Sequence, residues 1–298
     1  MDKRHLLLAA TAAIALPGCR GCEEPARPIA PASQVVAPTP APAPAVAEPA
    51  AATPVYAGPS SKAVDGFQLA TGFLDAKGKP LPQPLAGTTT AIYTTALDPE
   101  SRPLGALTPI AGAEMSGFLV ARDLRHVLAA SATAPVREGA DARALPFAPP
   151  GGGDHALVVV FKPQGGALHA VVSPVSVAGN LPQLMGPGLN GLSMRAQTAT
   201  EHVELALLPA DRTPTAPLDL QIHDVDAAGK RRGAVQVPLA VLVNAPMGRA
   251  IALEATGEPA VLHWQQPEPG EWLVLIAPKQ GDRALAFHLT IPAAPDKR

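Results

Sequence analysis

The chain has 298 residues and a net charge of −2, with 36 prolines and only 3% aromatic residues. This length predicts about two domains. Nucleic-acid binding requires a clustered basic face, and the one basic block, Lys230-Arg231-Arg232, falls in a predicted turn. We therefore exclude nucleic acid as a partner.

The first nineteen residues, MDKRHLLLAATAAIALPGC, combine a basic start with a short apolar run that ends just before Cys19. This pattern is typical of a secretory signal peptide. The run is shorter than the roughly 20 apolar residues that span a bilayer. The segment LPGC resembles the lipobox of bacterial lipoproteins. The resemblance implies that residues 1–18 are removed, that Cys19 carries palmitate and related acyl chains, and that the lipid bilayer is a partner. Arg20 follows the cysteine in place of the aspartate that favours inner-membrane retention, so the resemblance implies the outer membrane, facing the periplasm or the surface.

Cys19 and Cys22 form a C-x-x-C pair and are the only cysteines. A thioredoxin-like redox pair needs a strand before it and a helix after it. Here an apolar leader precedes the pair and a proline-rich tract follows, so we set the redox interpretation aside.

The tract 19–62 is rich in proline and alanine. Such a composition favours extended polyproline II over a packed core. We predict a disordered tether between the lipid anchor and the folded part. The alternative is a PxxP ligand for a partner domain. Most such domains are cytosolic, and the leader indicates export.

From residue 63 the chain alternates short β-rich runs with turn signals, which predicts an all-β sandwich at 63–180. We expect its strands at 66–74, 88–97, 115–121, 127–131, 156–161 and 168–177. Residues 181–197, rich in glycine, proline and asparagine, are expected to connect to a second sandwich at 198–298. We expect that sandwich's strands at 202–208, 218–225, 239–243, 250–255, 261–264, 271–277 and 284–291.

The two halves form an internal repeat. Residues 154–162 (DHALVVVFK) match 271–279 (EWLVLIAPK), and Phe147 and Trp264 hold the same place before the preceding turn. The earlier hairpin 97–107 (LDPESRPLGAL) matches 225–235 (VDAAGKRRGAV). A period this long indicates domain duplication rather than a solenoid. The sequence therefore predicts two tandem immunoglobulin-like β-sandwiches of one kind.

Three segments carry a further resemblance: residues 107–115 (LTPIAGAEM), 120–124 (VARDL) and 269–272 (PGEW). They are similar to motifs of a family of secreted, heavy-metal-associated bacterial β-sandwich proteins. Where that family has histidines, this chain has Ser116, Ala129 and Ser131. The family's metal-ligand positions are therefore replaced here.

Seven histidines lie outside the leader, and no two have the local spacing that places two metal ligands on one face. His155 and His169 are not expected to be cross-strand neighbours. We expect isolated histidines at the surface or at strand ends. The alternative is a metal site assembled from distant strands, with Met115 and His126 as its candidate ligands.

Catalytic motifs such as G-x-S-x-G or a P-loop are absent from the sequence. Asp154 and Glu271 could suggest a glycosidase, but they hold equivalent positions in different repeats. Trp264 and Trp272 could form a sugar-binding platform, although the repeat places them in the core. We therefore predict no enzyme and no cofactor. The expected function is a lipid-anchored envelope protein with a structural or partner-binding role, and the alternative is a copper-type metal-binding protein of the periplasm.

Overall fold

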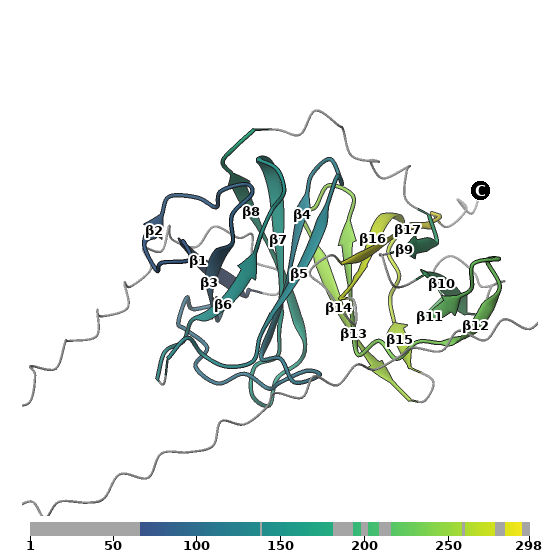
Figure 1. The fold of residues 1–298 in the computed structure, drawn as a ribbon. Helices are drawn as coiled ribbons and strands as arrows, with labels where there is room; N and C mark the ends of the chain where they lie inside the picture. Colours follow the sequence, from purple (N-terminus) through teal and green to yellow (C-terminus); the bar gives the residue numbers. More distant parts are fainter. Residues whose placement is uncertain are drawn as a thin grey trace, which may run out of the picture. The chain divides into compact units, whose positions relative to one another are not determined.

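The computed structural model describes residues 66–137, 139–180, 193–197, 202–208, 216–257, 260–277 and 284–293. The predicted signal peptide, Cys19 and the predicted tether lie outside these residues. The described residues form β-strands joined by turns, without a helix (Figure 1). The described part of the chain accordingly offers no helix of the length and apolarity that crossing a membrane requires.

The first sandwich consists of two four-stranded antiparallel sheets. One sheet has the order β2-β1-β3-β6 and the other the order β5-β4-β7-β8. The strands are β1 (Gln68–Leu74), β2 (Pro80–Leu81), β3 (Thr90–Leu97), β4 (Met115–Ala121), β5 (Val127–Ala132), β6 (Arg143–Phe147), β7 (Gly153–Phe161) and β8 (His169–Val177).

The second sandwich repeats this connectivity. Strands β14-β13-β16-β17 stand where β5-β4-β7-β8 stand in the first, and β10-β11-β15 stand where β1-β3-β6 stand. A strand with no predicted counterpart, β9, covers Arg195–Gln197 inside the expected connection. The other strands are β10 (His202–Leu208), β11 (Leu218–Val225), β12 (Arg231–Ala234), β13 (Leu239–Asn244), β14 (Ala250–Thr256), β15 (Val261–Trp264), β16 (Gly270–Ile276) and β17 (Leu285–Ile291). The prediction of two immunoglobulin-like sandwiches is thereby confirmed.

The repeat extends to individual backbone hydrogen bonds. The hairpin after β4 turns at Leu124 (φ 58°), and the hairpin after β13 turns at Met247 (φ 53°). Both are large buried residues in a left-handed conformation that such residues rarely adopt. In both hairpins this residue donates its N–H to the carbonyl three positions earlier. The two turns therefore align the two halves residue by residue, with Leu124 equivalent to Met247.

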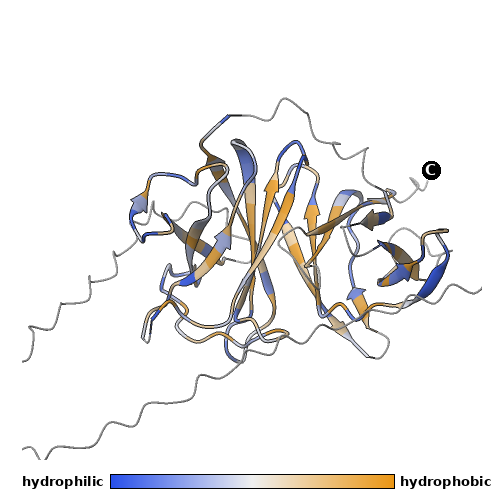
Figure 2. Ribbon diagram, viewed as in Figure 1, coloured by the Kyte–Doolittle hydropathy of each residue, from blue (hydrophilic) through white to orange (hydrophobic). Residues whose placement is uncertain are grey.

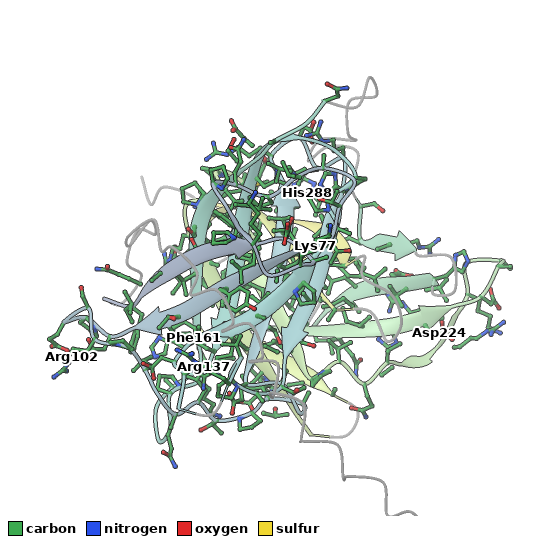
Figure 3. The ribbon with its side chains drawn as sticks, turned by 60° about the vertical axis from the view of Figure 1, so that its left-hand side comes forward. Lys77, Arg102, Arg137, Phe161, Asp224 and His288 are labelled. Atoms are coloured by element: carbon green, nitrogen blue, oxygen red, sulfur yellow. The ribbon has the colours of Figure 1, made fainter. Side chains whose placement is uncertain are left out.

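Four aspartate and asparagine side chains shape the turns. Asp75, Asp98 and Asp226 each accept the N–H groups of the residues two and four positions later, and Asn244 closes its hairpin in a similar way. The backbone N–H of Arg102 is the main cause that lowers the pKa of Asp98. Arg102 itself lies at the outer tip of this turn (Figure 3). These polar side chains are thus engaged in local structure.

Three apolar clusters lie between the sheets of the two sandwiches. One fills the first sandwich, one fills the second, and one lies between the sheet β5-β4-β7-β8 and the sheet β14-β13-β16-β17. Both middle sheets are therefore buried on both faces. This explains the unbroken apolar runs of β7 and β13, which alternation alone would not produce (Figure 2).

Equivalent residues of the two halves belong to this middle cluster. The registers make Phe118 equivalent to Val241, and Val158 to Leu275, and all four are buried there. The same holds for the further pairs Val120 and Val243, Leu124 and Met247, Val127 and Ala250, and Ala156 and Leu273. A contact between equivalent faces is isologous, as in a two-fold symmetric dimer. We call this contact the inter-sandwich face.

Some predictions for strands were wrong. β6 contains Pro146 and was not predicted, yet it lies at the edge of its sheet, where proline is tolerated. Arg231 and Arg232, placed by the sequence in a turn, begin β12, which pairs with β11.

Candidate functional site

The most unusual polar feature in the described residues is a buried pair of histidines. The Nε2 atoms of His126 and His155 lie 2.8 Å apart, and the ring centroids lie 4.9 Å apart. His126 is 8% exposed and His155 is 1% exposed. The expectation of isolated surface or strand-end histidines is therefore wrong for these two, and we call them the histidine pair.

Backbone geometry at the end of β4 brings the pair together. His155 lies opposite Ala121 in the β4–β7 register, and the N–H of Ala121 donates to the carbonyl of His126. Gly153 (φ 112°) lets β7 begin beside this hairpin. The hairpin thus places two histidines from distant parts of the sequence at one end of the sheet.

The protons of the pair can be assigned from its partners. Nδ1 of His155 lies 2.8 Å from the carbonyl oxygen of Gly153, which can only accept, so Nδ1 carries a proton. In neutral His155 the Nε2 atom is then an acceptor, and Nε2–H of His126 donates to it. Two protonated rings would point two N–H groups at each other. The pair therefore holds at most one positive charge.

Burial is the largest cause that lowers the pKa of His155, and the Arg125 guanidinium lowers it further. The hydrogen bond to Gly153 and the nearby carboxylates of Asp123 and Asp154 act in the opposite direction. Arg125 donates to the carbonyl of Gly152 and lies 3.5 Å from Asp123. Burial thus disfavours a positive charge on His155, and the short contact between the two Nε2 atoms fits a hydrogen bond between neutral rings.

The two residues named from the sequence as metal ligands are not close together. Met115 begins β4 and is 1% exposed within the core of the first sandwich. His126 lies beyond the other end of β4, a rise of about 20 Å. Of these two residues, His126 has another histidine, His155, beside it in place of Met115. His155 lies opposite Val175 and His169 lies opposite Phe161, so these two histidines are not cross-strand neighbours, as the sequence predicts.

Other candidate residues have structural surroundings. Trp264 and Trp272 are each 3% exposed and pack edge to face at 5.1 Å, which confirms the core interpretation and does not fit a sugar platform. Asp154 and Glu271 occupy the same second position of β7 and β16. Cys19 lies outside the described residues. Within the described ranges, three or more histidine, cysteine, aspartate or glutamate side chains do not gather as a metal site.

No family model matches the sequence, and no curated protein matches it. Among solved structures, the chain is similar to the FdeC adhesin of Escherichia coli, with 14% identity, a TM-score of 0.24, and coverage of 78% of this chain and 65% of that one. The chain thus spans less than two thirds of that structure. It is also similar to domains 4 and 5 of the S-layer protein SbsC, with 12% identity, a TM-score of 0.21, and coverage of 75% and 98%. Dimeric latent PorU from Porphyromonas gingivalis gives 12% identity, a TM-score of 0.24, and coverage of 79% and 21%. Similarities at these values carry no argument about function.

Proposed function

We propose that this chain is a non-enzymatic lipoprotein of the cell envelope whose two sandwiches have a structural or partner-binding role. The observation that carries this proposal is the inter-sandwich face. This face joins the two sandwiches through a buried apolar contact. The two sandwiches therefore share one extended core and are not independent domains joined only by a linker. The aspartates that form the turns also support a structural role, because each side chain accepts backbone N–H groups of its own turn.

The anchor is part of the same proposal. Cys19 would hold the chain to the outer membrane, and more than one acyl chain makes such anchoring stable. The proline-rich tract 19–62 would then separate the sandwiches from the bilayer. Support for this part comes from the sequence pattern alone.

The anchor is tested by expressing the chain with Cys19→Ser and, as the matched control, with Cys22→Ser. We expect an alkyne palmitate analogue to label the original chain and the Cys22→Ser chain, and to leave Cys19→Ser unlabelled. We also expect the first two in the membrane fraction and the third in the soluble envelope fraction. Equal labelling of all three chains, or of none, would refute the lipoprotein proposal.

The role is tested by complementation of a strain that lacks the gene, with detergent sensitivity of the envelope as the readout. A structural role predicts rescue by the original chain and by a His126→Leu/His155→Phe variant. It predicts no rescue by Leu275→Asp, which places a charge in the inter-sandwich face. Failure of the histidine variant to rescue, despite normal folding, would instead favour the second candidate function.

That second candidate is copper-type metal binding, and the histidine pair is the observation that favours it. Imidazole nitrogens are common ligands of such ions, and this pair places two of them side by side. Both nitrogens would have to turn from each other toward the ion, and further ligands would come from outside the pair. Calorimetry with Cu(I), Cu(II) and Zn(II) tests it: binding should be lost in His126→Ala and kept in Met115→Ala. If both variants still bind the metal, the histidine pair is not the metal site.

A further inference from the structure

A cavity lies beside the inter-sandwich face and is lined by residues of both sandwiches. It has a volume of about 290 Å³ and lies where the start of β4 and the end of β5 meet the start of β13, the end of β16 and the start of β17. Phe118, Leu239, Ile276 and Leu285 form its buried floor. Ala111, Ser131 and Gln236 lie on its exposed rim. The cavity is therefore open to solvent and apolar inside.

Comparison with the equivalent position of the other repeat shows how the cavity arises. Ser116 and Ser131 are cross-strand partners in β4 and β5, and their equivalents Leu239 and Glu254 are cross-strand partners in β13 and β14. Glu254 reaches across to Lys162 at the end of β7, with Nζ and Oε2 2.9 Å apart. Leu239 itself lines the cavity, and Glu254 is held by Lys162. Ser116 and Ser131 are smaller than these two equivalents, so they leave more space beside the leucine.

The lining determines what chemistry the space accepts. Among the residues that the structure describes, the cavity is lined by fifteen, which include no aspartate, glutamate, lysine, arginine or histidine; the polar side chains among them are Ser116, Ser131 and Gln236. A charged ligand would lose its hydration there without gaining an ion pair, which is costly. A neutral ligand with an apolar body would bury its surface on the floor and could hydrogen-bond through one polar group to a serine hydroxyl.

The volume limits the size of such a ligand. Benzene fills an apolar cavity of about 150 Å³. The present cavity is about twice that size, so it suits a molecule with two fused rings or an aliphatic body of similar bulk.

We propose that this cavity is a binding site for a neutral, mainly apolar small molecule of about ten to twelve heavy atoms with a single hydroxyl or carbonyl group. The site is independent of the lipid anchor and of the histidine pair. It makes the inter-sandwich face a ligand-responsive contact, because the bound molecule touches both sandwiches at once.

The test uses 1-naphthol as the neutral probe and 1-naphthoate as its charged counterpart, each titrated into the full chain by fluorescence and calorimetry. We expect saturable binding of one 1-naphthol per chain and at least about tenfold weaker binding of 1-naphthoate. Ser116→Leu introduces the side chain that Leu239 has at the equivalent position of the second sandwich, and should abolish the binding of 1-naphthol. Ser176→Leu makes the same chemical change at an exposed site of β8 and should leave binding unchanged.

A second variant keeps the test decisive if Ser116→Leu folds poorly. Ala113→Phe fills the same cavity from a different segment, and folding of each variant is checked by circular dichroism. Equal binding of 1-naphthol by the original chain and a folded cavity-filling variant would overturn the proposal. Binding of several probes per chain without saturation, or no binding at all, would overturn it too.

Discussion

The first and second sandwiches share their connectivity but differ in what fills the equivalent position near the start of one central strand. In the first, His155 of β7 is hydrogen-bonded to His126. In the second, Trp272 of β16 packs on Trp264 and donates its indole N–H to the carbonyl of Glu268. The same backbone thus supports a polar couple in one half and an aromatic couple in the other. The comparison shows that the hydrogen-bonded frame, and not the side chains it holds, is the constant part of this repeat.

The halves also differ in how their sheets are held together. In the second, β14 pairs with β15, so that the two sheets continue into each other. In the first, Arg143 performs a related task with side-chain bonds: it is 1% exposed and donates to Glu114 and to the carbonyls of Gly105 and Asp141. One half therefore uses backbone pairing where the other uses a buried cation.

Removal of the aromatic couple should have the largest effect on stability. Trp272→Ala is expected to lower the free energy of unfolding by about 3–5 kcal/mol, because it deletes a large buried side chain. His155→Ala at the equivalent position removes less apolar surface and should cost about 1–3 kcal/mol, mainly through the lost hydrogen bonds. Urea unfolding measures both, and an equal loss for the two variants would contradict the comparison.

Removal of the buried cation should come next. Arg143→Met keeps most of the side-chain stem but leaves Glu114 and two carbonyls without their donor, at a cost of about 3 kcal/mol. The control is Arg102→Met, whose side chain is 71% exposed, and which should change the urea midpoint little. A similar small change for Arg143→Met would show that the cation does not hold the sheets.

The polar couple should make the protein sensitive to acid. The folded state lowers the pKa of His155 from 6.5, so below about pH 6.5 the unfolded chain binds more protons than the folded chain. The stabilising contribution is therefore complete above that pH and declines as the pH falls, by up to about 1.4 kcal/mol per pH unit for one proton. His126→Leu/His155→Phe should flatten this slope in urea titrations performed with a chelator. An unchanged slope in the double variant would assign the acid sensitivity to other groups.

A reciprocal exchange in the equivalent hairpin turns should have the smallest effect. Ser101 has a φ of 64° where its equivalent Gly229 has a φ of 79°. Ser101→Gly relieves a left-handed serine and should raise stability by about 0.5 kcal/mol, while Gly229→Ser should lower it by a similar amount or more. Thermal unfolding of the two variants gives the signs, and shifts of the same sign would contradict the equivalence of the turns.

Much of this fold could be predicted because its strands carry strong local patterns. Met115–Ala121, His202–Leu208 and Val261–Trp264 have the predicted bounds. The pattern failed where another contact decides the structure. β6 carries a proline that an edge tolerates, and the three-residue β9 is held by pairing with β10.

The candidate site could be predicted only in part. His126 stood out as a ligand type, but its neighbour depends on which strand lies beside β4. Hairpin signals identify β5 as a neighbour of β4 along the chain, whereas β7 pairs with β4 only through the order of the sheet. The cavity was equally hidden, since it depends on which faces of the two sandwiches meet. Both features required knowledge of contacts between residues far apart in the sequence.

The isologous face also has a consequence for the order in which the chain is made. Synthesis proceeds from the N-terminus, so the first sandwich is complete while its apolar partner surface is still missing. During that interval β4, β5 and β7 expose a surface shaped to fit a close copy of itself, and a neighbouring nascent chain carries such a copy. Because of the duplication, the second sandwich of the same chain and the first sandwich of a neighbouring chain compete for this exposed apolar face. Correct maturation requires that the second sandwich of the same chain binds first.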